Sequence, residues 1–489
     1  MALVMGVDSS TQSCKVQLRD AETGALVGSG SADHPATRPP VSEQSASSWW
    51  NALIVAFERA VASAGVRKSD VAAISVAGQC HGLVLMDDLG QVLRPVKLWN
   101  DLTSAPQAQA MVAEAGPKYW ADQVGSVPPP AFTITKLAWM AANEPDVLAA
   151  TSQICLPHDW LTWRLSGQLV TDRSEASGTG YYAAWDNAYR YDILRHFGGV
   201  EADILLPQVL GPDTPVGSIS TQAANELGLV SSVVIGPGAG DQHAAALGMG
   251  LQPGDIAFSL GTSGVVMAVS DGPVHDAGGV IDGVCDATGR YLPLVCVLNA
   301  ATVTDWFRNL LGVSVEQFDE LALSVGPESR TVTLAAYFDG ERRPNLPYAN
   351  GLLAGLTTAT SRAELARAAV DGVVMGLLEG LDAIRGYGIA TNRRVLVVGA
   401  PSASAAYRQS LADFLQRPVM RIDTPSATAR GACLQAAAVL HGVAIDEIRN
   451  AWPPTVVQVT EPGPMPTENL RAAYRRLTAF RDMDAVPNR

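Results

Sequence analysis

Lysine is scarce in this sequence, and its distribution excludes two large classes of phosphate-binding enzyme. The 489-residue chain contains five lysines, the last of them at position 136. The loop GxxxxGK[ST], whose lysine binds phosphates in P-loop nucleotide enzymes, is absent. The HRD and DFG motifs of protein kinases are absent as well. Any phosphate bound by the second half of the chain must therefore be held by backbone N–H groups, arginine or a metal ion.

Cysteine pairs, long apolar runs and positive charge are also lacking. The six cysteines are scattered without a CxxC pair, which indicates a reducing compartment and argues against zinc. No apolar run reaches the roughly 18 residues of a membrane helix, and the N-terminus has no basic region typical of a signal peptide. The formal net charge of -14 argues against nucleic acid or an anionic membrane as partner. We therefore expect a cytoplasmic protein.

The sequence does have the pattern of a large α/β protein. Its length fits two large domains, and 47% hydrophobic against 17% charged residues allows a large core. Short apolar strands alternate with amphipathic helices throughout, which is typical of the α/β class. Strands are expected over residues 71–76, 233–235 and 395–398, and helices over 45–64, 361–387, 404–415, 426–440 and 468–481.

Two similar hairpins indicate an internal duplication. Residues 4–7 and 15–18 read as strands around a polar turn, and residues 256–260 and 265–269 read as strands around a second turn. Each hairpin would open one half of the chain. We therefore predict two similar domains, covering residues 1–245 and 246–489.

The turns of both hairpins are candidate phosphate sites. In the first, Asp8 offers a carboxylate to a metal ion, and the small residues that follow it offer backbone donors that can hold phosphate without lysine. In the second, glycines would let the backbone approach a nucleotide closely. Taken alone, each turn is more often an ordinary polar hairpin turn. The presence of two, one with Asp8, favours a function.

A third candidate is Asp241, which follows a strand and the glycine-rich residues 236–240 and begins a helix. The helix N-terminus would stabilise its negative charge, and an ionised carboxylate can act as a general base toward a sugar hydroxyl. The alternative is that Asp241 only caps the helix.

Polar residues follow two further strands. Cys80 and His81 come after residues 71–76, and Asn100 and Asp101 come after residues 92–98. Such side chains suit a small polyhydroxylated ligand. The alternatives are an ordinary core or loop histidine at position 81 and a turn at positions 100–101.

Taken together, several segments resemble the FGGY family of carbohydrate kinases over essentially the whole chain. The segments that carry the resemblance are residues 6–15, 42–50, 77–82, 98–101, 132–139, 340–344 and 351–371. Residues 77–82 and 98–101 look most like the members that phosphorylate D-xylulose. The resemblance implies the actin-like ATPase fold, with two ribonuclease H-like domains around a catalytic cleft. It also implies transfer of a phosphoryl group from ATP to the sugar, giving D-xylulose 5-phosphate.

The resemblance assigns a role to individual residues. Asp241 matches the catalytic base, and Asp8 matches the carboxylate that positions Mg²⁺ and also counts as catalytic. The residues implied for the sugar are Cys80, His81, Asn100, Asp101 and Gln242. The residues implied for the nucleotide are Ser10, Thr11, Gln12, Gly261, Thr262, Gly399 and Ala400.

Three positions depart from the family pattern and leave alternatives open. Ser10 stands where many members have glycine, Gln242 where the xylulose-phosphorylating members often have asparagine, and Pro401 where a glycine would offer a backbone donor. A kinase for ribulose, erythritol or glycerol therefore remains an alternative. So do a non-catalytic sugar- or nucleotide-binding regulator and an actin-like ATPase or filament protein. The partners expected are a small sugar and ATP, and a homodimer is expected because dimers are frequent among relatives.

Overall fold

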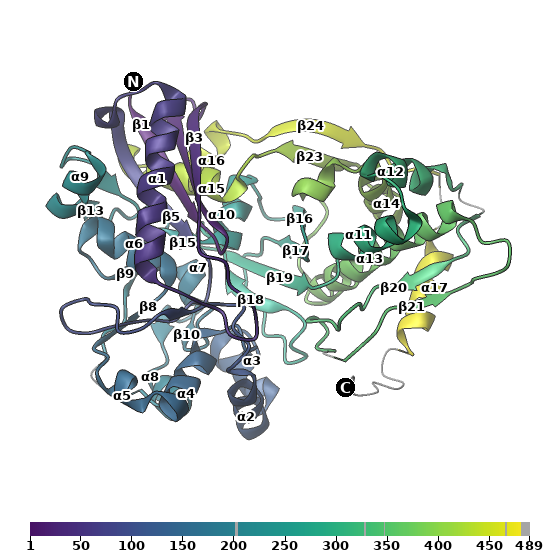
Figure 1. Ribbon diagram of the computed structural model, residues 1–489, viewed down its shortest axis with the longest axis horizontal. Coiled ribbons are helices and arrows are strands. Elements are labelled where there is room, and N and C mark those ends of the chain that lie inside the picture. The colour runs from purple at the N-terminus through teal and green to yellow at the C-terminus, as the bar shows by residue number, and fades with distance from the viewer. Residues whose placement is uncertain (201–203, 327–328, 347, 465–466, 481–489) are drawn as a thin grey trace.

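The computed structural model describes residues 1–200, 204–326, 329–346, 348–464 and 467–480. Two seven-stranded sheets organise the molecule (Figure 1). The first sheet has the order β13-β14-β5-β1-β2-β3 with β15 beside β5, and the second has the order β18-β19-β17-β16-β22-β23-β24. We call the first sheet and the helices packed on it the first lobe (residues 3–248 and 427–451), and the second sheet with its helices the second lobe (residues 256–423 and 455–478).

The first sheet begins with the predicted hairpin and contains both antiparallel and parallel strand pairs. Its strands are β1 (Leu3–Ser9), β2 (Ser13–Asp20), β3 (Leu26–Asp33), β5 (Val71–Gly78), β13 (Gly217–Ser218), β14 (Val234–Ile235) and β15 (Ala239–Gly240). Strand β1 pairs antiparallel with β2 and parallel with β5. Helix α1 (Ala46–Ala64) covers β2 and β3, because Trp49, Leu53 and Phe57 recur at helical spacing and are fully buried. The hairpin, the strand at 71–76 and the helix at 45–64 are thus confirmed.

Between β5 and α10 the chain adds small helices and two-stranded sheets to the first lobe. The helices are α2 (Ala105–Ala115), α3 (Pro117–Val124), α4 (Thr133–Asn143), α5 (Pro145–Ala149), α6 (Pro157–Ser166), α7 (Arg173–Ala176), α8 (Tyr191–Gly198), α9 (Thr221–Leu227) and α10 (Asp241–Gly248), with η1 (Lys68–Asp70) before β5. The paired strands are β4 (Glu43–Gln44) with β7 (Val96–Lys97), β6 (Val84–Met86) with β8 (Gln153–Cys155), β9 (Val170–Asp172) with β12 (Gln208–Leu210), and β10 (Tyr182–Ala183) with β11 (Ala188–Tyr189). A core around Trp120, Phe132 and Leu137 holds several of these helices together.

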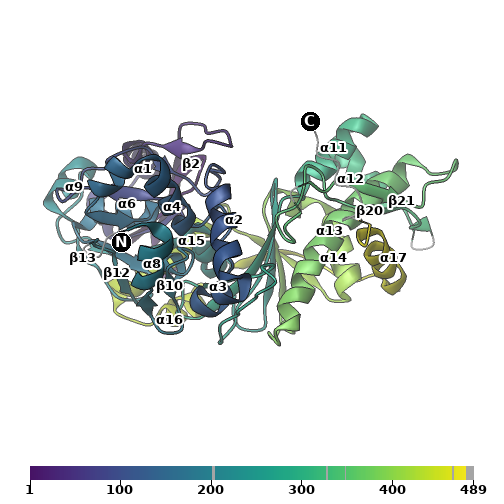
Figure 2. The same cartoon turned by 90° about the horizontal axis from the view of Figure 1, so that it is seen from below.

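The second sheet repeats the arrangement of the first, a hairpin followed by a parallel strand. Its strands are β16 (Ile256–Leu260), β17 (Gly264–Ala268), β18 (Asp282–Cys285), β19 (Tyr291–Val297), β22 (Val395–Val398), β23 (Val419–Asp423) and β24 (Thr455–Thr460). The other elements of this lobe, among the described residues, are α11 (Ala301–Leu311), α12 (Val315–Ser324), β20 (Thr333–Ala335), β21 (Leu352–Ala354), α13 (Arg362–Gly386), η3 (Ala400–Ala403), α14 (Ala405–Leu415) and α17 (Glu468–Thr478). In Figure 2 the second sheet lies between the first lobe and helices α13 and α14.

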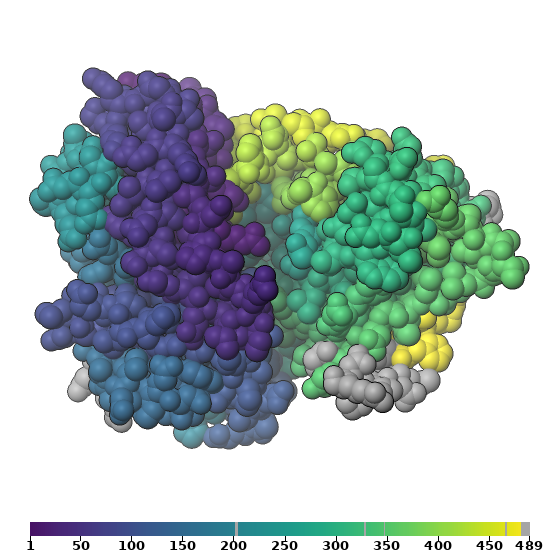
Figure 3. Space-filling model, in the orientation of Figure 1, coloured from purple at the N-terminus to yellow at the C-terminus, as the bar shows by residue number. Residues whose placement is uncertain are grey.

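The chain returns to the first lobe near its end. Helices α15 (Ala427–His441) and α16 (Ile445–Ala451) follow β23, and α15 packs against β1, β5 and α10. The contact is close, since a Cβ on Gly431 would lie 1.9 Å from the carbonyl oxygen of Ala244, and a Cβ on Gly248 would lie 1.8 Å from that of Ala427. The division into residues 1–245 and 246–489 stays a prediction. Seen from outside, the surface is hollowed where the two lobes meet (Figure 3).

Most other predicted elements are confirmed. The strand at 395–398 and the helices at 361–387, 404–415 and 426–440 correspond to β22, α13, α14 and α15. Helix α17 ends at Thr478, and residue 481 of its predicted span lies outside the described residues. Within the described ranges no single helix has the length and apolarity to cross a membrane, although α15 and α16, bent by 119°, pass that test together by length and composition alone.

Candidate functional site

Strand register brings the predicted catalytic carboxylates to one edge of the first sheet. Strand β5 pairs in parallel with β1 on one side, where Asp8 faces Ala77, and with β15 on the other, where Gly240 faces Gly78. Because parallel strands end at the same edge, the residues that follow them gather there. Asp8, the segment after Gly78 and Asp241 therefore lie together.

Asp241 begins α10, where two donors fix its carboxylate. Its Oδ1 accepts the backbone N–H of Gln242 at 2.7 Å and lies 3.5 Å from the Sγ of Cys80. Burial and the negative charge of Asp8 raise the pKa of Asp241 to about 7. A carboxyl group that titrates near neutral pH is suited to take a proton from an attacking hydroxyl.

Asp8 is buried, and its carboxylate contacts residues from the beginning of the chain and from near its end. It accepts hydrogen bonds from the hydroxyls of Ser10 and of Ser426, the latter at 3.1 Å, and the Nζ of Lys15 lies 3.9 Å away. Burial raises the pKa of Asp8 although these three groups act to lower it. Ser426 caps α15, so the first hairpin is tied to the segment that joins the second sheet to α15.

The turn after Asp8 is held from behind by other parts of the first lobe. The Oγ1 of Thr11 accepts the indole N–H of Trp99 at 2.8 Å, and its carbonyl accepts a hydrogen bond from Gln44 at 2.9 Å. The backbone N–H of His34 donates to the carbonyl of Gln12 at 2.8 Å. Among the described residues these bonds engage carbonyl groups and a hydroxyl of the turn, and none of them uses a backbone N–H group of Ser10 or Thr11.

The nucleotide-side residues of the second lobe also meet. The backbone N–H of Ala301, at the start of α11, donates to the carbonyl of Gly261 at 3.0 Å, and the hydroxyl of Thr302 donates to that of Thr262 at 3.1 Å. Gly399 has φ 91°, and a Cβ there would lie 1.8 Å from the carbonyl oxygen of Leu260. Only glycine fits this approach, which seats Gly399 against the residue that precedes Gly261.

Ala400 and Pro401 open the short helix η3. The first N–H groups of a helix have no partner inside it, and proline is well tolerated there. The loss of one N–H at Pro401 therefore costs the helix nothing, and any consequence is confined to the ligand that this segment contacts.

His81 is held in one orientation and one tautomer. Its backbone has φ 65°, its backbone N–H donates to Glu175 at 3.1 Å, and its Nδ1 lies 2.8 Å from the carbonyl oxygen of Gly178. Because a carbonyl only accepts, Nδ1 carries the hydrogen and Nε2 is left as an acceptor. Burial, followed by the charges of Lys136 and His243, lowers the pKa of His81 to about 3, so the ring is neutral at physiological pH.

Asn100 and Asp101 differ in what their side chains do. Asp101 is fully buried, and accepts hydrogen bonds from the backbone of Ser42 at 2.8 Å and of Thr103 at 3.0 Å, with the Nζ of Lys97 at 3.3 Å. Burial acts to raise the pKa of Asp101, but the Thr103 and Ser42 hydrogen bonds and the charge of Lys97 lower it overall. The carboxylate of Asp101, which was predicted to contact the sugar, therefore already accepts hydrogen bonds from protein groups. The Oδ1 of Asn100, in contrast, is buried without a partner among the described residues and remains free for a ligand.

Sequence reasoning missed a buried cluster of titratable residues behind Cys80 and His81. The Nδ1 of His158 lies 3.2 Å from Asp159 and 3.7 Å from Glu175, and His243 lies 4.0 Å from the Sγ of Cys80. Burial acts to lower the pKa of His158, but Asp159 and Glu175 raise it to about 9. Burial raises the pKa of Glu175 to about 7 against the effect of His158. The one signal in the sequence is that acidic residues and a histidine follow the short strands β8 and β9.

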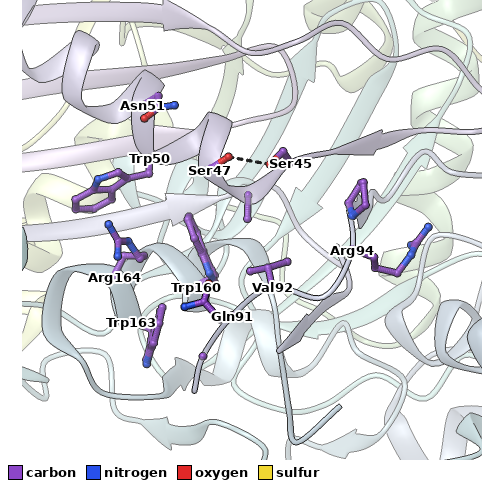
Figure 4. A pocket seen from close by; sticks show the side chains of 13 residues that line it. Ser45, Ser47, Trp50, Asn51, Gln91, Val92, Arg94, Trp160, Trp163 and Arg164 are labelled. Carbon is purple, nitrogen blue, oxygen red and sulfur yellow. Dashed lines mark hydrogen bonds between the residues drawn. The ribbon is translucent and has the colours of Figure 1, made fainter. Parts of the chain in front are cut away.

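A surface pocket of about 480 Å³ lies elsewhere in the first lobe (Figure 4). It is lined by the start of α1, by the segment before β7, and by α6, where the guanidinium of Arg164 lies 4.8 Å from the ring of Trp50. None of the residues predicted to bind sugar or nucleotide lines it.

Comparison with known proteins finds similarity over nearly the whole chain. The N-terminal domain of the FGGY family of carbohydrate kinases matches residues 3–248, and the C-terminal domain of that family matches residues 256–440. A protein of Streptomyces rubiginosus named xylulose kinase is 40% identical over 92% of this chain and 90% of its own length. Another of that name from Streptomyces coelicolor is 39% identical over 99% of this chain and 97% of its own.

Solved structures agree with the fold. The crystal structure of xylulose kinase from Bifidobacterium adolescentis has a TM-score of 0.86 and 39% identity, and the match covers 97% of this chain and 99% of that one. Glycerol kinase from Plasmodium falciparum shares the fold, with a TM-score of 0.87 at 18% identity and 99% of both chains covered. The predicted actin-like ATPase fold is thereby confirmed.

Proposed function

Since the chain belongs to the FGGY family of carbohydrate kinases, we propose that it transfers the γ-phosphoryl group of ATP to D-xylulose and forms D-xylulose 5-phosphate. ATP is the co-substrate of this family. The choice of D-xylulose is supported by two relatives named xylulose kinase, which are 39–40% identical to this chain across both lobes. The observation that carries the proposed chemistry is the partly buried carboxylate of Asp241, which meets Cys80 and lies near Asp8 at the edge where the sheet strands end.

The reaction is an in-line displacement. A sugar hydroxyl oxygen forms a bond to the γ-phosphorus while the bond from that phosphorus to the bridging oxygen of ADP breaks. The proton of the hydroxyl passes to Asp241, whose raised pKa keeps the carboxylate basic enough to accept it. The N–H of Gln242 and the thiol of Cys80 hold the carboxylate in place for this transfer.

His81 and Asn100 are proposed to select the sugar. The Nε2 of a neutral His81 can only accept, and thus binds a sugar hydroxyl as donor. The amide of Asn100 offers its unpartnered oxygen as a second acceptor. We propose that Asp101 holds Asn100 in position through its bonds to Ser42 and Thr103, and does not itself contact the sugar. Cys80 and Gln242 flank the base and complete the proposed sugar site.

The nucleotide is proposed to lie between the lobes. The backbone N–H groups of Ser10, Thr11 and Gln12 would face its phosphates from the first lobe, and Gly261 and Thr262 from the second. Gly399 and Ala400 would hold the adenosine end. This assignment is consistent with a second half that has no lysine.

Asp8 is the proposed anchor for Mg²⁺. Its oxygens face two neutral hydroxyls and a lysine 3.9 Å away, and no cluster of three metal-binding side chains occurs among the described residues. This fits Mg²⁺, which is commonly bound through one or two carboxylates together with the phosphates of the substrate. When bound, the ion neutralises charge on the phosphates. The homodimer and the cytoplasmic location stay predictions.

A substrate panel tests the proposed function. Purified protein with Mg²⁺ and ATP would be tested for ADP release with D-xylulose, D-ribulose, L-ribulose, glycerol, erythritol and no sugar. We expect strong stimulation by D-xylulose, with phosphorus NMR placing the new ester on C5. Stimulation by another compound alone would move the substrate within the family. A complete lack of stimulation would contradict the proposal and favour the regulator or filament alternatives.

A further inference from the structure

The segment Gly340-Glu341-Arg342, part of the family resemblance, lies in the second lobe between β20 and β21. The side chain of Glu341 is buried and fixes this turn. Its carboxylate accepts the backbone N–H of Leu298 at 2.5 Å, the amide of Asn299 at 2.9 Å and the backbone N–H of Arg342 at 2.7 Å. Leu298 and Asn299 lead directly into α11, whose first residues support the turn at Gly261 and Thr262. The position of Arg342 is therefore set by the same segment that sets the nucleotide-side turn.

The side chain of Arg342 crosses to the first lobe. Its guanidinium carbon lies 5.4 Å from the ring centre of Trp99, a cation–π contact. The indole N–H of Trp99 in turn donates to Thr11 at 2.8 Å, and Asn100 follows Trp99 in the chain. Arg342 thus lies over the side chain that connects the predicted phosphate turn to the predicted sugar segment.

Among the described residues, the guanidinium of Arg342 has no carboxylate partner. Over the ranges that the structure describes, no ion pair or side-chain hydrogen bond involves it, whereas the neighbouring Arg343 is paired with Asp282 at 2.7 Å. A planar group with five donors, held against an indole and otherwise unpaired, is suited to bind an anion through two parallel hydrogen bonds.

The charge of Arg342 reaches the catalytic region. Besides burial, Lys136 and His243, it helps to lower the pKa of His81. Burial raises the pKa of Cys296 on β19 to about 11, with Arg342 acting to lower it and Asp241 acting to raise it. Arg342 and Asp241 therefore both act on the same thiol from opposite lobes.

The proposed chemistry needs a cation at this place. Asp8 and Asp241 bring two carboxylates to the site, and the triphosphate adds further negative charge. During transfer, charge spreads over the three equatorial oxygens of the phosphoryl group, and an arginine that meets them lowers the barrier strongly in other phosphoryl-transfer enzymes. The second lobe has no lysine to fill this role.

We propose that Arg342 is a catalytic residue that binds the non-bridging oxygens of the phosphoryl group as it passes from ATP to the sugar. This rests on the proposed kinase function. The guanidinium donates hydrogen bonds and exchanges no proton, because the hydroxyl proton goes to Asp241 and the leaving oxygen stays with ADP. Glu341 and Trp99 are positioning residues, since they act through Arg342.

The test compares Arg342→Ala and Arg342→Lys with the wild-type enzyme. At saturating ATP and D-xylulose we expect kcat to fall about 100-fold or more for Arg342→Ala. Sugar and ATP dissociation constants, measured by calorimetry, should change less than about threefold, because the contact forms only during transfer. Free guanidinium at millimolar concentration should partly restore the kcat of Arg342→Ala. Arg475→Ala, which removes an exposed second-lobe arginine (67% exposed), is the matched control and should leave kcat unchanged.

Arg342→Lys covers the case in which the alanine variant does not fold. It keeps the charge and the aliphatic stem but loses the planar fork, and we expect kcat to fall about tenfold. A wild-type kcat in either folded variant would overturn the inference, as would a loss that is wholly a weaker sugar affinity. If the wild-type enzyme itself releases no ADP with any sugar, the proposed function fails, which is a separate result from an active enzyme that does not need Arg342.

Discussion

At the scale of single residues, the negative charge of Asp8 acts on Asp241. With burial, it raises the pKa of Asp241 from 3.8 to about 7. A general base with this pKa is protonated and inactive in mildly acidic solution, and it becomes competent as the pH rises through neutrality. The pair thus combines the carboxylate proposed to bind the metal with a carboxyl group that titrates near neutral pH.

This predicts the acid limb of the pH profile. The value of kcat/KM for D-xylulose should fall about tenfold per pH unit below pH 7, because the protonated form of Asp241 cannot accept the hydroxyl proton. Asp8→Asn should move this limb to lower pH, since it removes the charge that raises the pKa of Asp241, while kcat also falls. The measurement is steady-state kinetics from pH 5 to 9. An acid limb that stays in place in Asp8→Asn would contradict the coupling.

Glu175 shows how a residue with no motif shapes the site. Its Oε1 accepts the backbone N–H of His81, and a Cβ on Gly240 would lie 2.8 Å from its Oε2. It therefore touches both the segment that carries His81 and the residue before Asp241.

Glu175→Gln is expected to raise KM for D-xylulose about tenfold while KM for ATP stays the same, because the amide holds the His81 backbone less firmly. This increase in KM should vanish in a His81→Ala background, since Glu175 then has no imidazole to position. Asp159→Asn, a neighbouring buried carboxyl that contacts His158 but not His81, is the control. Equal losses from Glu175→Gln with and without His81 would show a merely structural role.

At the scale of elements, the hairpins and long helices follow from local patterns. Apolar runs bounded by small polar residues locate β1, β2, β16 and β17, and helical spacing of aromatic residues locates α1. The neighbours of His81 could not be predicted in this way. Glu175 accepts a hydrogen bond from the backbone N–H of His81 across 94 positions of the chain. Asp101 accepts one from the backbone N–H of Ser42 across 59 positions. Such contacts depend on tertiary packing that leaves no local pattern.

The packing of α10 against α15 likewise could not be predicted from local patterns, and it depends on glycine at the contact. Gly431→Ala should lower the free energy of unfolding by about 2 kcal/mol or more, because its Cβ would lie 1.9 Å from the backbone oxygen of Ala244 and force the helices apart. Gly376→Ala in α13 is the matched control, since its Cβ meets only the hydroxyl of Tyr474 at 3.5 Å. We expect this control to be neutral or stabilising by up to about 1 kcal/mol. Urea denaturation measures both, and equal stability of the two variants would contradict the close packing.

At the scale of the whole molecule, each half of the proposed phosphoryl-transfer site comes from a different lobe. The residues proposed as base, metal carboxylate and sugar contacts lie on the first lobe, and the turns proposed for the nucleotide lie mainly on the second. The family resemblance implied this division, because the residues it assigns to the sugar all precede position 246 and most of those it assigns to the nucleotide follow it. It did not indicate that residues 427–451 pack on the first sheet, or that Ser426 bonds to Asp8 across the junction. Both depend on the return of the chain after β23.

The account depends most directly on Asp241 as the base, and one measurement tests it. Sugar-dependent ADP release would be followed for the wild-type enzyme and for Asp241→Asn at pH 8, with ATP and D-xylulose binding measured by calorimetry. We predict that the variant binds both ligands, keeps its fold and loses turnover by about 100- to 10,000-fold. Turnover at the wild-type rate in a folded Asp241→Asn protein would contradict the account.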